Sequence, residues 1–297
     1  MSGYYRALAR AKLLKRSAAF ERCCRLMAGM PGLCRIEDAG KRLFAQVLLP
    51  RTPRWVKVET GLAQGLWLRL NLSVEGNYWL GDYEVRVQDL LGVLCVPGSV
   101  FFDIGANLGF FSLAVANAVG PRGKVVAFEP EPENYARLRE MAVRNNLQAR
   151  IVTMETAVWS RTEQKGVPFR RGGRQATYGG VSSDGVTPVL AEGEMLRVTA
   201  VSLDDFLRQG NRAPDVLKVD VEGGECEVLK GCEELFSRVR PALICEVHRA
   251  EAASWIASWL STKEYVARWQ VPEELYPRLL FAQPAVPSRN RRDSDHE

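Results

Sequence analysis

The sequence has little histidine and no cysteine pair at metal-binding spacing. Only 2 of its 297 residues are histidines, and one of them, His296, lies in a polar final segment. The 7 cysteines form no Cys-x-x-Cys pair and lie at positions 23, 24, 34, 95, 226, 232 and 245. We therefore expect no metal cofactor, and reduced thiols of a cytoplasmic protein rather than a disulfide framework.

Long hydrophobic runs are also absent. The longest apolar stretches, such as Leu43–Leu49 and Ala242–Cys245, are far shorter than the run of about 20 residues that spans a bilayer. The basic N-terminus has no apolar segment behind it, which argues against a secretory signal peptide. Hydrophobic residues at 46% and charged residues at 25% are typical of a globular domain and exclude a disordered or collagen-like chain.

Acidic residues are scarce at the N-terminus. Residues 1–60 contain 13 Lys/Arg and 4 Asp/Glu, whereas the rest of the chain contains 27 and 31. We expect residues 1–55 to form a basic, mainly helical N-terminal arm. Two interpretations stay open: a solvated helix packed on the body by its leucines, or a helix whose residues 1–42 contact a polyanion or the anionic inner face of the membrane.

Residues 56–286 alternate strand and helix patterns and are expected to form one α/β domain with a parallel sheet. The alternation lapses at about 161–198, where we expect a lid or hairpin insertion, and 287–297 reads as a disordered tail. Helices are predicted at Phe110–Val119, Pro132–Asn146 and Glu225–Phe236. The predicted strands are Val56–Glu59, Leu66–Leu72, Val100–Ile104, Val125–Phe128, a third sheet strand from Ile151–Thr153 and Thr156–Trp159, Val216–Asp220 and Ala242–Val247.

The strongest functional signal is the segment 100–112, where an apolar strand runs into a glycine loop that opens a helix. Gly105 permits a sharp turn, and Gly109 lets the helix lie close to the sheet. Glu129 follows twenty residues after Gly109, at the end of the next predicted strand. An acid at that position binds the two hydroxyls of an adenosine ribose.

The loop lacks the Gly-x-Gly-x-x-Gly pattern of dinucleotide-binding folds. Asn107 stands where a pyrophosphate would need glycine, and Asp103 at the strand tip would repel that pyrophosphate. S-adenosyl-L-methionine has no phosphate and carries a sulfonium and an ammonium group, which a carboxylate attracts. The loop therefore predicts S-adenosyl-L-methionine as the cofactor rather than NAD or a flavin.

These residues, together with the segments 127–130 and 217–225, resemble the FkbM family of S-adenosylmethionine-dependent methyltransferases. The resemblance covers about residues 60–250 and departs from the family pattern beyond it. Glu264-Tyr265 replaces a usual Gly-Tyr, and Leu279–Gln283 matches the closing strand weakly. Further matching elements are Tyr78–Glu84, Ala157-Val158, Ser202–Asp205 and Glu246-x-His248.

The resemblance implies a class I (Rossmann-like) α/β fold, with a seven-stranded, mostly parallel sheet and helices on both faces. It also implies methyl transfer to a hydroxyl, most often of a sugar in a glycan, glycolipid or glycosylated natural product. Two interpretations of Tyr83 and Glu84 stay open: they close over the methionine end of the cofactor, or they are an ordinary packing residue and a surface charge. The other cofactor residues that it implies are Asp103, Gly105, Ala106, Asn107 and Gly109 at the methionine part, Glu129 and Pro130 at the ribose, and Glu155 and Ala157 near the adenine.

A hydroxyl acceptor must lose a proton during transfer, so a carboxylate or imidazole should lie near it. Asp220, Glu222 and His248 follow predicted strands at the edge where open α/β sheets bind ligands, and are the predicted catalytic residues. Each also has a plain structural interpretation. Asp220 would be a helix N-cap, Glu222 a partner of the helix dipole, and His248 the donor of one structural hydrogen bond.

Leu203–Phe206 is predicted to cap a helix that starts near Asp205. The alternative function is a non-catalytic module that keeps the cofactor fold and docks on a membrane or polyanion through its basic arm. Nucleic acid is not an expected partner, because the body outside the arm is net acidic.

Overall fold

The structure is a computed structural model that describes residues 52–171, 180–181, 194–270 and 276–285. The predicted tail at 287–297, and the predicted arm at 1–55 up to residue 51, lie outside these ranges. Within them, no helix combines the length and the apolar character that crossing a bilayer requires.

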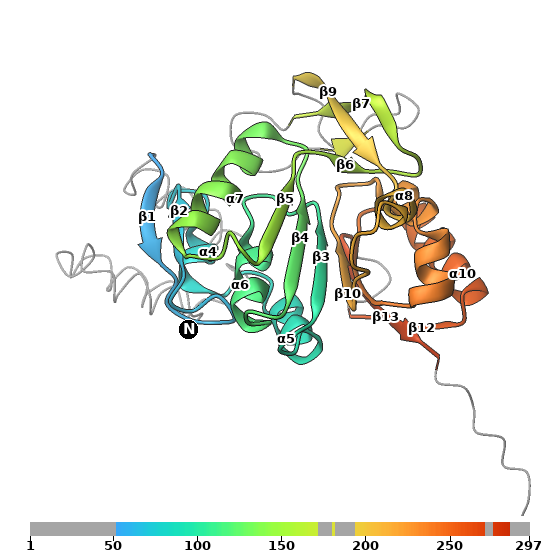
Figure 1. Cartoon of the computed structure of the whole chain (residues 1–297), viewed down its shortest axis with the longest axis horizontal. Helices are drawn as coiled ribbons and strands as arrows, with labels where there is room; N and C mark the ends of the chain where they lie inside the picture. The colour runs from blue at the N-terminus through green and yellow to red at the C-terminus, as the bar shows by residue number, and fades with distance from the viewer. Residues whose placement is uncertain (1–51, 172–179, 182–193, 271–275, 286–297) are drawn as a thin grey trace, which may run out of the picture.

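Seven strands form the central sheet in the order β12-β13-β11-β10-β3-β4-β5, which confirms the predicted fold class (Figure 1). All are parallel except β13, which runs antiparallel to both of its neighbours. The strands are β3 (Val100–Ile104), β4 (Lys124–Phe128), β5 (Ile151–Met154), β10 (Val216–Val219), β11 (Ala242–Val247), β12 (Tyr265–Trp269) and β13 (Arg278–Pro284).

Helices cover both faces of this sheet, because the side chains of its parallel strands are buried on both faces. Successive side chains of a strand point to opposite faces, so Phe101 packs in one core and Phe102 in the other. The first core includes side chains of α4 (Gly76–Leu80), α5 (Val85–Leu94), α6 (Phe110–Ala118) and α7 (Pro132–Arg144). The second includes α8 (Leu203–Arg208), α9 (Glu225–Lys230), the π-helical turn η1 (Leu235–Val239) and α10 (Ala250–Thr262).

A second sheet, ordered β6-β9-β7-β8, leaves the main sheet just after β5 and lies at the top of Figure 1. Its strands are β6 (Ala157–Val158), β7 (Glu163–Arg170), β8 (Gly180–Val181) and β9 (Met195–Val201). Antiparallel β7 and β9 form a hairpin inside the segment where we expected a lid or hairpin. A separate two-stranded sheet pairs β1 (Arg54–Lys57) with β2 (Trp67–Leu70).

Two local predictions are wrong. Ile151–Thr153 and Thr156–Trp159 do not form one strand: β6 pairs with β9, and Trp159 packs in the small core of the second sheet. Leu203–Phe206 does not cap its own helix. Ser202 caps α8 by accepting a hydrogen bond from the Asp205 amide. The Asp204 carboxylate instead accepts hydrogen bonds from the amides of residues 234 and 235, 30 residues away along the chain.

The segment that departs from the family pattern still forms the last two strands. Glu264 has a backbone φ of 58°, so it occupies the left-handed region that favours glycine. Its carbonyl accepts hydrogen bonds from Arg240 and from the amide of Ala285. These backbone contacts hold the tight turn between α10 and β12 although the residue is not glycine.

We expect Glu264→Gly to stabilise the protein, because glycine adopts this φ without steric strain and the carbonyl contacts remain. The free energy of unfolding should rise by about 0.5–1 kcal/mol in urea denaturation. Ser261→Gly, in the last turn of α10 with ordinary helical backbone, should instead lower it by about 0.5 kcal/mol. Equal losses in both variants would show that Glu264 is not strained.

Candidate functional site

The glycine loop brings the ends of β3 and β10 together. A Cβ atom on Gly105, whose φ is 76°, would lie 1.8 Å from the Asp220 carbonyl oxygen, so no larger residue fits. Gly109 is constrained differently from our expectation. A Cβ there would lie 2.2 Å from Leu138 of α7, so this glycine permits contact with a neighbouring helix rather than with the sheet.

Glu129 ends β4 and fixes the shape of the loop. One of its carboxylate oxygens accepts a hydrogen bond from the Asn107 amide at 2.7 Å, and the other from the Glu131 amide at 2.9 Å. Burial raises the pKa of Glu129 to about 8, although these two backbone bonds lower it. Each oxygen can accept a second hydrogen bond. The residue therefore has the capacity to bind the ribose hydroxyls predicted for it.

The remaining predicted cofactor residues follow strands β3, β4 and β5 of the main sheet, except Ala157, which lies in β6 of the second sheet. Ala106 is buried, Pro130 half-buried and Glu155 exposed at the end of β5. The Asn107 side chain accepts a hydrogen bond from the Leu108 amide. The Ala157 side chain is buried in the core of the second sheet, so only its backbone is available to a ligand.

Lys218, which our sequence reasoning missed, lies between two of the predicted acids. Its Nζ is 3.1 Å from Asp220 Oδ2 and 3.9 Å from Asp103 Oδ1, and its side chain is only 4% exposed. Burial alone would lower the pKa of Lys218, but the charges of these acids and of Glu84 raise it, so the ammonium group persists. Asp103 also accepts a hydrogen bond from Ser112 at 2.6 Å and is 1% exposed. Its other oxygen, Oδ1, is buried without a hydrogen-bond partner among the described residues.

Tyr83 and Glu84 lie at the same edge, at the start of α5. The Tyr83 ring packs against Tyr78 and against Phe110 and Phe111 of α6. Burial raises the pKa of Glu84, and Asp220 and Asp103 raise it further while Lys218 lowers it. Glu84 Oε2 is buried without a hydrogen-bond partner among the described residues. An unpaired buried carboxylate oxygen is expected where a cationic group of a ligand binds.

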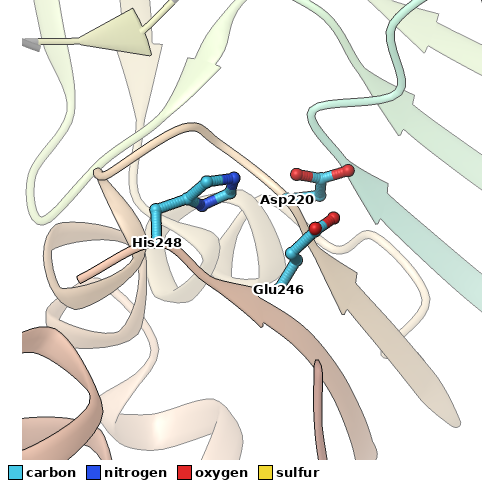
Figure 2. Close-up of side chains that lie close together, drawn as sticks. All are labelled: Asp220, Glu246 and His248. Carbon is cyan, nitrogen blue, oxygen red and sulfur yellow. The ribbon is translucent and has the colours of Figure 1, made fainter. Parts of the chain in front are cut away.

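Asp220, Glu246 and His248 converge from the ends of β10 and β11 (Figure 2). One ligand-type atom from each lies within 4.8 Å of the others, a spacing that a metal ion could bridge. Two of the three are already engaged, because Asp220 pairs with Lys218 and the His248 Nε2 atom lies 3.2 Å from Glu222. Burial, with repulsion from Asp220 and Glu84, raises the pKa of Glu246 to about 8. This arrangement of carboxyl groups around an imidazole favours proton transfer. Our expectation that the protein binds no metal stays a prediction.

His248 is held by two carboxylates. Glu225, also missed in the sequence, lies 2.6 Å from Nδ1 and is fully buried in the first turn of α9. Burial lowers the pKa of His248, but the hydrogen bond to Glu225 and the charges of Glu222, Glu225 and Asp220 outweigh burial and raise it to about 9. The N-cap of α9 is Gly224, so Asp220 is not a helix cap and its plain structural interpretation is wrong.

The strand order, with the antiparallel strand β13 next to the edge strand β12 and a glycine loop after β3, defines a class I S-adenosylmethionine-dependent methyltransferase. The acids at this edge outnumber the cations Lys218 and His248, which suits a cofactor with sulfonium and ammonium groups. Residues 103–269, more than half of the chain, match the methyltransferase FkbM domain. The chain belongs to the FkbM methyltransferase family, and its cofactor is S-adenosyl-L-methionine.

Similar proteins carry related names. The chain is 33% identical over 184 residues to 31-O-demethyl-FK506 methyltransferase FkbM of Streptomyces tacrolimicus, covering 54% of this chain and 70% of that one. It is 29% identical over 206 residues to hexuronic acid methyltransferase AglP of Haloferax volcanii, covering 65% and 79%. A solved structure of methyltransferase FkbM from Methylobacillus flagellatus KT has a TM-score of 0.45 and 18% identity. That match covers 62% of this chain and 43% of the other.

We expect Lys218→Met to destabilise the protein strongly, because the buried carboxylate of Asp103 and the half-buried carboxylate of Asp220 lose their counter-charge. The free energy of unfolding at pH 7 should fall by about 3–5 kcal/mol in urea denaturation. Lys230→Met removes a lysine that is 46% exposed and pairs with Glu227, and should cost under about 1 kcal/mol. A loss at Lys218 no larger than at Lys230 would contradict the role of the ammonium group.

Proposed function

We propose that the protein transfers a methyl group to a hydroxyl oxygen of a saccharide. The observation that carries this proposal is the placement of Asp220 and His248 side by side at the carboxyl edge of the sheet (Figure 2). When bound, S-adenosyl-L-methionine supplies a methyl group that is already activated by its sulfonium. The protein must therefore orient the acceptor oxygen and remove its proton.

The chain's own residues divide these tasks. Asp220 Oδ2 accepts a hydrogen bond from Lys218, which fixes the carboxylate and leaves the other oxygen to accept one from the acceptor hydroxyl. His248 lies next to it and is the group that takes the proton when its ring is neutral, although the neighbouring carboxylates raise its pKa to about 9. Glu222, 31% exposed beside the imidazole, lies where an acceptor would enter.

A saccharide acceptor is supported by the polarity of this edge. The carboxyl groups of Glu84 before α5, of Glu222 in the loop after β10 and of Glu246 on β11 provide several hydrogen-bond acceptors for a polyhydroxylated ligand. One relative is named for hexuronic acid methylation, and another for an O-demethyl substrate. Incubation with labelled methyl donor and a panel of neutral and uronic-acid glycans, followed by mass spectrometry and NMR, tests the proposal. Label found only on nitrogen or on non-sugar carbon would refute it.

Cofactor binding should depend on Glu129. Glu129→Ala removes both the proposed ribose contacts and the hydrogen bond that holds the Asn107 amide. We expect it to weaken binding of S-adenosylmethionine and S-adenosylhomocysteine by more than about tenfold in calorimetry. NAD should not bind to either form. Glu133→Ala, which alters a side chain that is 72% exposed on nearby α7, is the control and should bind like the unaltered protein. Unchanged affinity in Glu129→Ala would overturn the ribose assignment.

Turnover should depend on Asp220 separately from cofactor binding. Asp220→Asn keeps the size of the side chain but removes its charge, so the acceptor hydroxyl loses its strongest hydrogen-bond partner. We expect turnover to fall by about a hundredfold or more, while S-adenosylmethionine affinity stays within about threefold. Release of S-adenosylhomocysteine and calorimetry measure the two effects. Asp89→Asn, an exposed acid on α5, is the matched control. Full turnover in Asp220→Asn would rule out this role.

A further inference from the structure

The two carboxylates that hold His248 differ in how firmly they are fixed. Glu225 is fully buried, begins α9, and accepts a hydrogen bond from the Gly223 amide at 2.9 Å with the same oxygen that contacts the His248 Nδ1 atom. Glu222 is 31% exposed, and its backbone has a φ of 51°, in a loop followed by two glycines. The only hydrogen bond or ion pair of its carboxylate among the described residues is the one at 3.2 Å to His248 Nε2.

We propose that Glu225 is the positioning residue of His248, and that Glu222 is a displaceable carboxylate which the acceptor hydroxyl replaces at Nε2. Glu225 keeps the ring proton on Nδ1, so the Nε2 lone pair is directed at the place that Glu222 leaves. This inference rests on the proposed function, because it assigns the acceptor hydroxyl to Nε2. The positioning role of Glu225 and the displaceable role of Glu222 cannot be distinguished from the sequence pattern.

The proton balance of the step follows from this geometry. The acceptor oxygen forms a bond to the methyl carbon, the carbon–sulfur bond breaks with its electron pair going to sulfur, and the hydroxyl proton moves to His248 Nε2. The resulting imidazolium keeps its Nδ1–H bond to Glu225, which stabilises the new charge where water is excluded. Release of the methylated product lets Glu222 return to Nε2.

The carboxylates of Glu225 and Glu222 form a clamp on the His248 ring. This clamp holds a proton on the ring before the acceptor arrives. His248 faces Glu225 from α9, Glu222 and Asp220 from the end of β10 and its loop, and Glu246 from its own strand. Two cations lie close to these groups: Lys218 pairs with Asp220, and Arg249 packs against Gly223. With a pKa of about 9, the ring is mostly protonated at neutral pH. When Glu222 leaves Nε2 it takes the Nε2 proton with it as a neutral carboxylic acid, because burial raises the pKa of Glu222, and it later releases that proton to solvent. The acceptor hydroxyl therefore meets a neutral ring with a free Nε2 lone pair.

Nitrogen NMR of histidine tests the clamp without any acceptor. The chain has 2 histidines, so a protein labelled at histidine gives two ring systems, and His296→Gln removes one of them and thereby assigns the signals of His248. The measurement gives the titration midpoint of His248 and the nitrogen that carries the proton in the neutral ring. In the unaltered protein we expect a midpoint near 9 and the proton on Nδ1.

Three variants separate the roles of the two carboxylates. Glu225→Gln should lower the midpoint by at least about one pH unit, because the imidazolium loses a buried counter-charge. Glu225→Leu should move the neutral ring's proton to Nε2, where Glu222 accepts it. Glu222→Gln should lower the midpoint but leave the proton on Nδ1. Glu227→Gln, on the same helix and paired with Lys230, is the matched control and should change neither reading.

Kinetic measurements provide a second test once an acceptor substrate has been identified. Glu225→Gln should lower the plateau of kcat by at least about tenfold with KM within about threefold, and Glu222→Gln should shift the rise of kcat/KM to lower pH. A neutral ring protonated on Nε2 in the unaltered protein, or an unchanged kcat in Glu225→Gln, overturns the inference. If Glu225→Leu does not fold, Glu225→Gln and Glu222→Gln still decide the case. If the NMR results hold but no saccharide is methylated, the proposed function fails and the clamp stands.

Discussion

The active edge of this protein depends on one buried ion pair network centred on Lys218. Its ammonium group lies between Asp103 at the end of β3 and Asp220 after β10, two strands that are neighbours in the sheet. Without that charge the two acids would repel each other inside the protein. The Lys218 ammonium group allows the ends of β3 and β10 to lie side by side. The carboxyl groups around them outnumber the cations, and the resulting negative field favours a cationic cofactor.

Much of the fold could be predicted from the sequence, because buried parallel strands and glycine turns leave local patterns. The strand Val100–Ile104 was predicted with the bounds that the structure shows, and Asp220, Glu246 and His248 follow from strands that end at one edge. The separation of β5 from β6 could not be predicted. Both segments are short and apolar, and only the pairing of β6 with β9, some 40 residues later, assigns it to a different sheet.

The contacts of the site residues were harder to predict than their positions. Lys218 reads as an ordinary polar residue inside a strand pattern, and one of its two partners, Asp103, comes from a strand far earlier in the sequence. The sequence indicates correctly that Glu225 is an acid in the first turn of a helix. The residues next to it in the sequence give no sign that it contacts His248, 23 residues later. A buried polar residue on the inner face of a parallel strand, as Lys218 is, was the one signal that could have been followed.

The second sheet has a core of its own, built from residues such as Trp159, Val167 and Phe169. It also contacts the main domain: Val158 and Val201 pack in the second main core. A further contact is made by Trp159, whose ring lies against Gly224 in the loop that carries Glu222. Another is Arg171, which forms ion pairs with Glu131 and Glu133, shortly after Glu129. An exchange of this sheet between relatives would therefore have to keep Val158 and Val201, which complete the second main core. Exchange of the part beyond them would alter the surroundings of the Glu222 loop by recombination rather than by point substitution.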